Sequence, residues 1–365
     1  MSPNLFLTST KPTTNQFLTN VHHRERMIET PRRLALLAMV ALLGSALVPG
    51  TAEATTGDND AVLHRLAVSS ADQAAVRAYW TAERIAGVPT DPPSDNPPSN
   101  KPDGTDWNRR NAGSRTIGRL FFTSRGEDSS CTATVVNSTN HSVVVTGGHC
   151  VAEANLIGED LQWITNPLFI PGYREGHAPY GSFVGRAGVA ARGWLEDDGT
   201  DSSGSAYDQA FLTLGRNEQG QRVADAVGAA QNIVFDQPAG RLVHEFGYPR
   251  STSDPAREGR PEYTGRRLAA CYGRPKQDHG MPDWPSPEGI WGVPCVMGGG
   301  SSGGPRITDL NEATGLGNII GVNIESAYID DEGNSCDFGS CVRHLVGPQF
   351  STAVTAALHR LAAQF

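Results

Sequence analysis

The stretch VVVTGGHC, residues 143–150, decides how the rest of the chain is interpreted. Its three valines and threonine predict a buried β-strand, because β-branched residues favour that structure. Two glycines end the strand and place His149 directly beside Cys150. A histidine held at the end of a buried strand can serve as a base near neutral pH. His149 is therefore a candidate catalytic base, which requires an acid and a nucleophile elsewhere in the chain.

Two further segments supply those groups. In YDQAFL, residues 207–212, Asp208 stands at the start of an apolar strand, and GGGSSGGP, residues 298–305, holds Ser302 in a glycine-dense loop. Acyl transfer needs a hydroxyl nucleophile, a base, an acid that orients the base, and N–H donors for the oxyanion. Glycines allow successive N–H groups to point into one concavity. We interpret His149, Asp208 and Ser302 as a catalytic triad.

These three segments resemble the Thr-Ala-Ala-His-Cys, Asp-x-Ala and Gly-Asp-Ser-Gly-Gly-Pro motifs of the trypsin/chymotrypsin family, in that family's order. The resemblance covers about residues 115–365, whose motifs are also similar to those of the secreted bacterial branch that includes the glutamyl endopeptidases. It implies an all-β fold of two antiparallel six-stranded β-barrels, with the site in the cleft between them. It also implies a serine endopeptidase that acts on proteins or peptides and needs no cofactor or metal ion.

The resemblance also implies a role for each residue of the site. Ser302 would be the nucleophile, His149 the general base and then the general acid, and Asp208 the group that orients the imidazole. The backbone N–H groups of Gly300 and Ser302 would form the oxyanion hole. A protein that keeps this fold without catalysis, as an extracellular binding module, is the alternative.

An α/β-hydrolase is a second enzyme class to consider, because the loop around Ser302 also fits the pattern Gly-x-Ser-x-Gly. In that fold the nucleophile opens a helix, and the acid and the base follow it in the chain. Here Gly303, Gly304 and Pro305 follow at once and would break such a helix. The α/β-hydrolase interpretation is therefore disfavoured.

Six cysteines in an exported protein predict three disulfides. The resemblance implies a bond between Cys131 and Cys150, which would tie the strand before the catalytic histidine to the residue after it. For the other four cysteines we favour the pairs that are near in sequence, although other pairings remain open. These pairs are Cys271–Cys295 and Cys336–Cys341.

Two positions depart from the family pattern. Ser301 stands where the family has an acid that binds the freed N-terminal ammonium of trypsin-like zymogens, so we expect no such activation. Val296, six residues before Ser302, stands at the expected base of the specificity pocket, so a preference for Arg or Lys has no carboxylate there. Glu325 lies near the expected far wall and could contact a basic side chain. The substrate preference is left open.

The N-terminal residues 1–54 are predicted to be a signal peptide. Arg32 and Arg33 precede an apolar run, residues 34–48, and the sequence Ala52-Glu53-Ala54 suits a cleavage site. The run is shorter than the roughly 20 residues that a membrane-spanning helix needs. We therefore expect a secreted, extracellular protein with no membrane association after cleavage.

Residues 55–114 are interpreted as a pro-segment or as a spacer that stays attached. A capping-box pattern at Ser70 predicts a helix to Ile85, and the Pro-rich residues 88–104 predict a flexible linker. Processing of a zymogen could follow Arg109-Arg110 or Arg115. The peptidase domain would then comprise residues 115–365.

Composition and patterning agree with this division. Short β-rich runs separated by Gly, Pro, Asn and Asp fill the peptidase domain, as an all-β fold requires; they are residues 118–123, 132–136, 142–146, 210–214, 241–246 and 319–324, with a final helix at 351–364. The formal net charge of −9 and the lack of a basic run exclude nucleic-acid binding.

The acidic residues Asp197, Asp198 and Asp201 predict a solvated turn rather than a calcium site. We expect a monomer.

Overall fold

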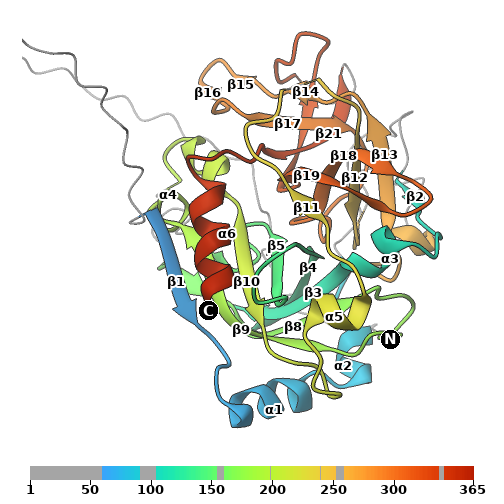
Figure 1. The fold of residues 1–365 in the computed structure, drawn as a ribbon. Coiled ribbons are helices and arrows are strands. Elements are labelled where there is room, and N and C mark those ends of the chain that lie inside the picture. Colours follow the sequence, from blue (N-terminus) through green and yellow to red (C-terminus); the bar gives the residue numbers. More distant parts are fainter. Residues whose placement is uncertain are drawn as a thin grey trace, which may run out of the picture. The chain divides into compact units, whose positions relative to one another are not determined.

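Strands from residues 117–214 close into a barrel (Figure 1). They are β3 (Ile117–Ser124), β4 (Glu127–Val135), β5 (Val143–Thr146), β8 (Thr165–Pro171), β9 (Phe183–Ala191) and β10 (Ala210–Leu214). Their order is β9-β10-β5-β4-β3-β8, all antiparallel, and the pairs Leu168–Val184 and Phe169–Phe183 join β8 to β9. The computed structural model describes residues 60–90, 104–153, 160–197, 199–238, 240–251, 259–336 and 341–365. The predicted signal peptide and most of the predicted linker lie outside these ranges.

The strand that opened the interpretation lies at the centre of this barrel. β5 covers Val143–Thr146, all buried, and is paired on one side with β4 and on the other with β10. Val144 is opposite Val135 on one neighbour and Leu212 on the other, and all three are fully buried. Burial of each such side chain contributes about 1.5–3 kcal/mol. The apolar run therefore fixes the strand that ends at His149.

The second half of the domain consists of two further sheets around one core. One has the order β11-β19-β18-β12-β13-β2 and the other β14-β17-β21-β20. Their bounds are β2 (Thr105–Asp106), β11 (Asn232–Ile233), β12 (Val243–Gly247), β13 (Ala269–Gly273), β14 (Lys276–Gln277), β17 (Ile290–Pro294), β18 (Pro305–Asn311), β19 (Leu316–Val322), β20 (Glu325–Ile329) and β21 (Val342–Pro348). Val243 and Ile320 from the first sheet pack with Val293 and Leu345 from the second. The predicted all-β fold of two barrels is confirmed, and two sheets build the second barrel.

Two short strand pairs and several helices complete the described elements. They are β6 (Ala152–Glu153) with β7 (Gln162–Trp163), β15 (Gly280–Met281) with β16 (Trp284–Pro285), α3 (Ala112–Thr116), α4 (Arg192–Leu195), η2 (Ser203–Tyr207), α5 (Val223–Val227) and η4 (Pro261–Tyr263). The predicted C-terminal helix is present as α6 (Thr355–Gln364) and packs on β9 and β10 of the first barrel. The hydroxyl of Thr213 donates to the carbonyl of Ala362 at 2.8 Å. Within the described ranges, no helix is long and apolar enough to cross a membrane.

The segment interpreted as a pro-segment or spacer packs on the first barrel. Its strand β1 (Ala61–Arg65) pairs antiparallel with β9 over five residues, and Figure 1 shows β1 beside α6. The single helix predicted from Ser70 to Ile85 is wrong, because it is divided into α1 (Ser70–Tyr79) and α2 (Ala82–Ala86). The chain turns at Trp80 to bury the indole, and Thr81 caps the second helix. The capping box is formed by Ser69 with Asp72, one residue earlier than predicted.

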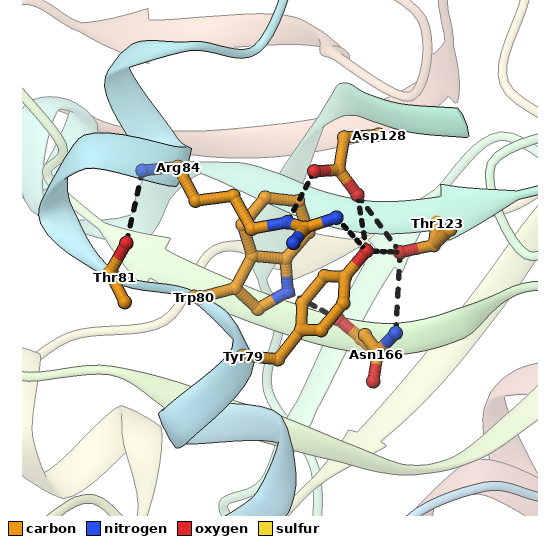
Figure 2. Close-up of polar contacts among 7 residues, drawn as sticks. All are labelled: Tyr79, Trp80, Thr81, Arg84, Thr123, Asp128 and Asn166. Atoms are coloured by element: carbon orange, nitrogen blue, oxygen red, sulfur yellow. Dashed lines mark hydrogen bonds and ion pairs between the residues drawn. The ribbon is translucent and has the colours of Figure 1, made fainter. Parts of the chain in front are cut away.

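A cluster of polar contacts holds this segment in place (Figure 2). The indole N–H of Trp80 donates to the carbonyl of Asn166 at 2.6 Å, and its ring packs against Phe121. The carboxylate of Asp128 on β4 accepts hydrogen bonds from the hydroxyl of Tyr79 at 2.7 Å and from Nε of Arg84 at 2.5 Å. The N-terminal segment therefore contributes side chains to the packing of the first barrel.

We expect Trp80→Ala to lower the free energy of unfolding by about 3–5 kcal/mol, because it removes a buried aromatic side chain and leaves a cavity. Urea unfolding followed by fluorescence or circular dichroism measures this change. Glu83→Ala, at an exposed position of α2, is the control and should stay within about 0.5 kcal/mol of wild type. Equal stability of all three proteins would show that the segment does not stabilise the barrel.

Candidate active site

His149 and Asp208 are brought together by the pairing of two strands. β5 ends at Thr146 and is paired with Ala210 of β10, so the residues just beyond these ends are neighbours. The backbone N–H of His149 donates to Oδ1 of Asp208 at 2.8 Å, and its Nδ1 lies 2.8 Å from Oδ2. Since an ionised carboxylate only accepts, Nδ1 carries the proton and Nε2 keeps its lone pair. The ring is thus oriented as a base requires.

This arrangement depends on a glycine and on burial. A Cβ at Gly148 would lie 3.0 Å from Oδ1 of Asp208, so a side chain there would push the carboxylate away. The carboxylate of Asp208 is only 7% exposed, and both of its oxygens are bound to His149. Trp194 on α4 packs edge-on against the imidazole. The glycines of the motif therefore serve the contact between the acid and the base.

The charge of Asp208 changes the titration of the imidazole. Burial by itself lowers the pKa of His149, whereas the negative charge of Asp208 and its hydrogen bond raise it. Glu325 and Glu153 act in the same direction. The pKa of His149 is therefore raised above the ordinary value of 6.5.

The loop that carries Ser302 is anchored by a residue of the first barrel. The backbone N–H of Thr132 on β4 donates to the carbonyl of Ser302 at 2.8 Å, and its hydroxyl donates to the carbonyl of Gly300 at 2.8 Å. Gly300 and Gly303 have φ values of +86° and +76°, which favour glycine. A Cβ at Gly303 would collide with Thr146, three residues before His149. The nucleophile loop and the histidine turn are therefore in contact.

The amide groups of this loop are used unequally. The N–H groups of Ser301 and Gly303 donate to the carbonyls of Gly298 and Asn323, at 3.1 and 2.7 Å. Within the part of the chain that the structure describes, the amides of Gly300 and Ser302 have no such acceptor. The hydroxyl of Ser302 donates to the carbonyl of Ile324 at 3.3 Å. The loop thus keeps two N–H donors available beside a serine.

Ser301, where the family has an acid, is fully buried. Its hydroxyl has no hydrogen-bond partner among the described residues. The loop is held instead by Thr132, without the ion pair that trypsin-like activation uses.

The sequence analysis missed a charged residue beside the expected pocket. The guanidinium of Arg343, on β21, donates to the carbonyls of Cys295 and Met297 at 3.2 and 2.8 Å, and also to the hydroxyl of Ser326. Those two carbonyls flank Val296. Burial lowers the pKa of Arg343 to about 10, so the group is still charged at neutral pH. The only sequence mark of this residue is a lone Arg in an apolar strand.

The structure contains three disulfides, in the pairs that we favoured from the sequence. They are Cys131–Cys150, Cys271–Cys295 and Cys336–Cys341. The first ties β4 to the residue after His149. Cys131, His149 and Cys150 lie close enough together to hold a metal ion, but the disulfide between the two cysteines leaves no free thiolate to bind one.

In the acidic loop, Asp197 and Asp201 each accept a hydrogen bond from a backbone N–H two residues on, as in a turn. Asp198 lies outside the described residues.

Solved structures of bacterial proteases share this architecture. A thermostable serine protease, AL20, from an extremophilic microorganism is 27% identical with a TM-score of 0.51, and the match covers 69% of this chain and 99% of that one. Protease Anisep from Arthrobacter nicotinovorans is 29% identical with a TM-score of 0.51, covering 69% and 96%. The chain has the fold of the chymotrypsin-like serine peptidases.

A Glu endopeptidase solved in complex with MPD shares the fold at 20% identity, with a TM-score of 0.50 and coverage of 72% and 98%. No protein-family model matches the chain, and no curated protein matches its sequence. The chymotrypsin-like fold and the serine protease neighbours support a hydrolase of the peptidase class.

We expect the imidazole of His149 to titrate above pH 6.5, because Asp208 stabilises its charged form. The chemical shift of its Hε1 proton, followed by NMR from pH 4 to 10, measures this pKa. Asp208→Asn should lower it. His359 is an internal control of opposite sign, since burial lowers its pKa. A pKa of His149 below 6.5 in the wild type would contradict the geometry.

Proposed function

We propose that the protein is a secreted serine endopeptidase that hydrolyses peptide bonds through an acyl-enzyme. His149, Asp208 and Ser302 form the triad, and the N–H groups of Gly300 and Ser302 form the oxyanion hole. The observation that carries the proposal is the two-point contact of Asp208 with His149 beside the loop that carries Ser302. The bacterial serine proteases that share the fold support it.

In the first half of the reaction, Oγ of Ser302 attacks the peptide carbonyl carbon and its proton passes to Nε2 of His149. The hydroxyl gives up its hydrogen bond to Ile324 as it turns to the imidazole. The developing oxyanion accepts hydrogen bonds from the amides of Gly300 and Ser302. The C–N bond then breaks, His149 protonates the leaving nitrogen, and an ester to Ser302 remains.

In the second half, His149 removes a proton from water, whose oxygen attacks the ester carbonyl. The tetrahedral intermediate collapses, Ser302 recovers its proton from His149, and the carboxylic acid product leaves. Asp208 holds the ring in this orientation and stabilises the imidazolium that forms twice in each cycle.

The cellular setting belongs to the same proposal. Three disulfides suit an extracellular protein, and the predicted signal peptide would direct secretion. Proteins or peptides are the proposed substrates, and the monomer the proposed state. A binding module without catalysis is not favoured: the hydrogen bond between Asp208 and His149 and the two amide groups without an acceptor among the described residues support the catalytic interpretation.

A fluorophosphonate probe should label the mature protein and fail to label Ser302→Ala. Turnover of a peptide substrate should fall by about 10⁶ in Ser302→Ala and in His149→Ala, the scale of triad loss elsewhere. Ser301→Ala is the matched control, because the adjacent hydroxyl has no partner among the described residues. Labelling that persists in Ser302→Ala, or a tenfold loss only, would sink the assignment.

Peptides with Arg or Lys on the acyl side of the scissile bond, at the residue bound in the pocket, should be poor substrates. The expected base of the pocket is Val296, and the backbone carbonyls on either side of it, those of Cys295 and Met297, are bound by the positively charged Arg343. We expect kcat/KM for such peptides to be at least about tenfold lower than for neutral ones. A peptide library measures the ranking, and a preference for Arg at this residue would contradict the account.

A further inference from the structure

Glu325 is the first residue of the strand next to the proposed nucleophile. It follows Ile324, whose carbonyl accepts the hydrogen bond from Ser302. Its strand, β20, is at the edge of the four-stranded sheet and pairs on one side with β21. Among the described residues, its other side is paired only at the far end, where the N–H of Cys336 donates to the carbonyl of Tyr328 and Ile329 bridges to Ser335. An extended peptide can add to such an edge as a further strand. The substrate residues close to the scissile bond would then lie beside Glu325.

The side chain of Glu325 faces away from the expected pocket. Successive side chains of a strand point to opposite faces. Ser326, the next residue, accepts a hydrogen bond from Arg343 and so faces the pocket base. Glu325 therefore points to the opposite side, toward the catalytic acid and base. This corrects the expectation that Glu325 lies on the far wall of the pocket.

The surroundings of Glu325 are acidic. Its side chain is exposed, and the negative charges that act on it come from Asp208 and Asp278. Desolvation by the protein atoms around the carboxyl, followed by the charges of Asp208 and Asp278, raises the pKa of Glu325, while His149 and the hydroxyl of Ser205 lower it. No lysine or arginine of the described ranges forms an ion pair with it. A positively charged group of a substrate would complement the negative charge at this position.

Exposed acids are usually solvated surface groups, and two of them follow shortly in the chain. Asp331 is bound by Lys276, and Glu332 lies in an exposed turn. Glu325 differs from both because it stands one residue from the carbonyl that binds Ser302 and its charge acts on His149. A substrate held by Ser302 would pass within reach of its carboxylate.

We propose that Glu325 selects peptides with a positively charged side chain close to the scissile bond, at a position other than the one bound above Val296. The inference rests on the proposed peptidase activity and names the substrates of that site. A Lys or Arg side chain of the substrate would form an ion pair with Glu325 that no Lys or Arg of the described residues forms. The preference is separate from the pocket, where Arg343 disfavours the same side chains.

The test uses peptides that differ in one charge. The pocket residue is held constant, and each position from P4 to P2 and from P1′ to P2′ carries either arginine or citrulline, which has nearly the same shape without the charge. At pH 8 the wild type should cleave the arginine peptide about fivefold faster in kcat/KM at one of these positions. Glu325→Gln should bring the ratio of kcat/KM for the arginine and citrulline peptides to about one, a ratio that any change in the titration of His149 leaves untouched. Added salt should weaken the preference.

Two further variants exclude simpler explanations. Glu332→Gln removes one exposed negative charge further along the chain and should leave the preference unchanged. Glu325→Lys should reverse the preference toward a peptide with glutamate at the same position, a gain that misfolding cannot produce. Equal labelling of all variants by the fluorophosphonate probe would show that the catalytic residues are intact.

The outcomes separate the two proposals. Labelling and hydrolysis without an arginine preference at any tested position, or with a preference that survives Glu325→Gln, would overturn the role of Glu325 and leave the peptidase standing. A wild-type protein that is neither labelled nor able to cleave any peptide would overturn both.

Discussion

The double contact between Asp208 and His149 is the constraint on which the rest of the candidate site depends. A carboxylate that is only 7% exposed must have its oxygens satisfied, and both oxygens are bound to this one histidine. The contact requires Gly148, and it requires the pairing of β5 with β10 to hold its register. A shift of one residue would turn the acid to the other face of the strand. The buried valines that lock β5 therefore fix the imidazole as well.

Strand β4 links the base to the nucleophile through two consecutive residues. Cys131 is joined to Cys150, next to His149, while Thr132 binds the carbonyls of Gly300 and Ser302. The loop that carries Ser302 is thus attached to the first barrel, although the strands after it belong to the second. This attachment explains how the loop keeps its shape with a serine at position 301, where the family has an acid.

The sequence predicted the features that depend on local chemistry. The residues of the site are surrounded by glycines that the structure requires, Gly148 for a close approach and Gly303 for a positive φ. The run of valines and threonine coincides with β5. Features set by tertiary packing were not predictable. At Trp80 the chain turns and the indole is buried against Phe121, and the only local signal of the break is Thr81, which caps α2. The side of the strand that Glu325 faces depends on a single-residue register.

The N-terminal segment shows why packing matters for the interpretation of residues 55–114. β1 covers the edge of β9, Trp80 fills a site on the barrel, and β2 then pairs with β13 in the second half of the domain. Cleavage after Arg110 would cut the chain beyond all of these contacts. It would break the covalent link without removing the paired strands or the buried indole, and exposing the edge of β9 would leave unpaired backbone groups. Release of a cleaved pro-segment therefore requires those contacts to open, and proteolysis alone does not supply that free energy. The same contacts would hold an uncleaved spacer on the barrel.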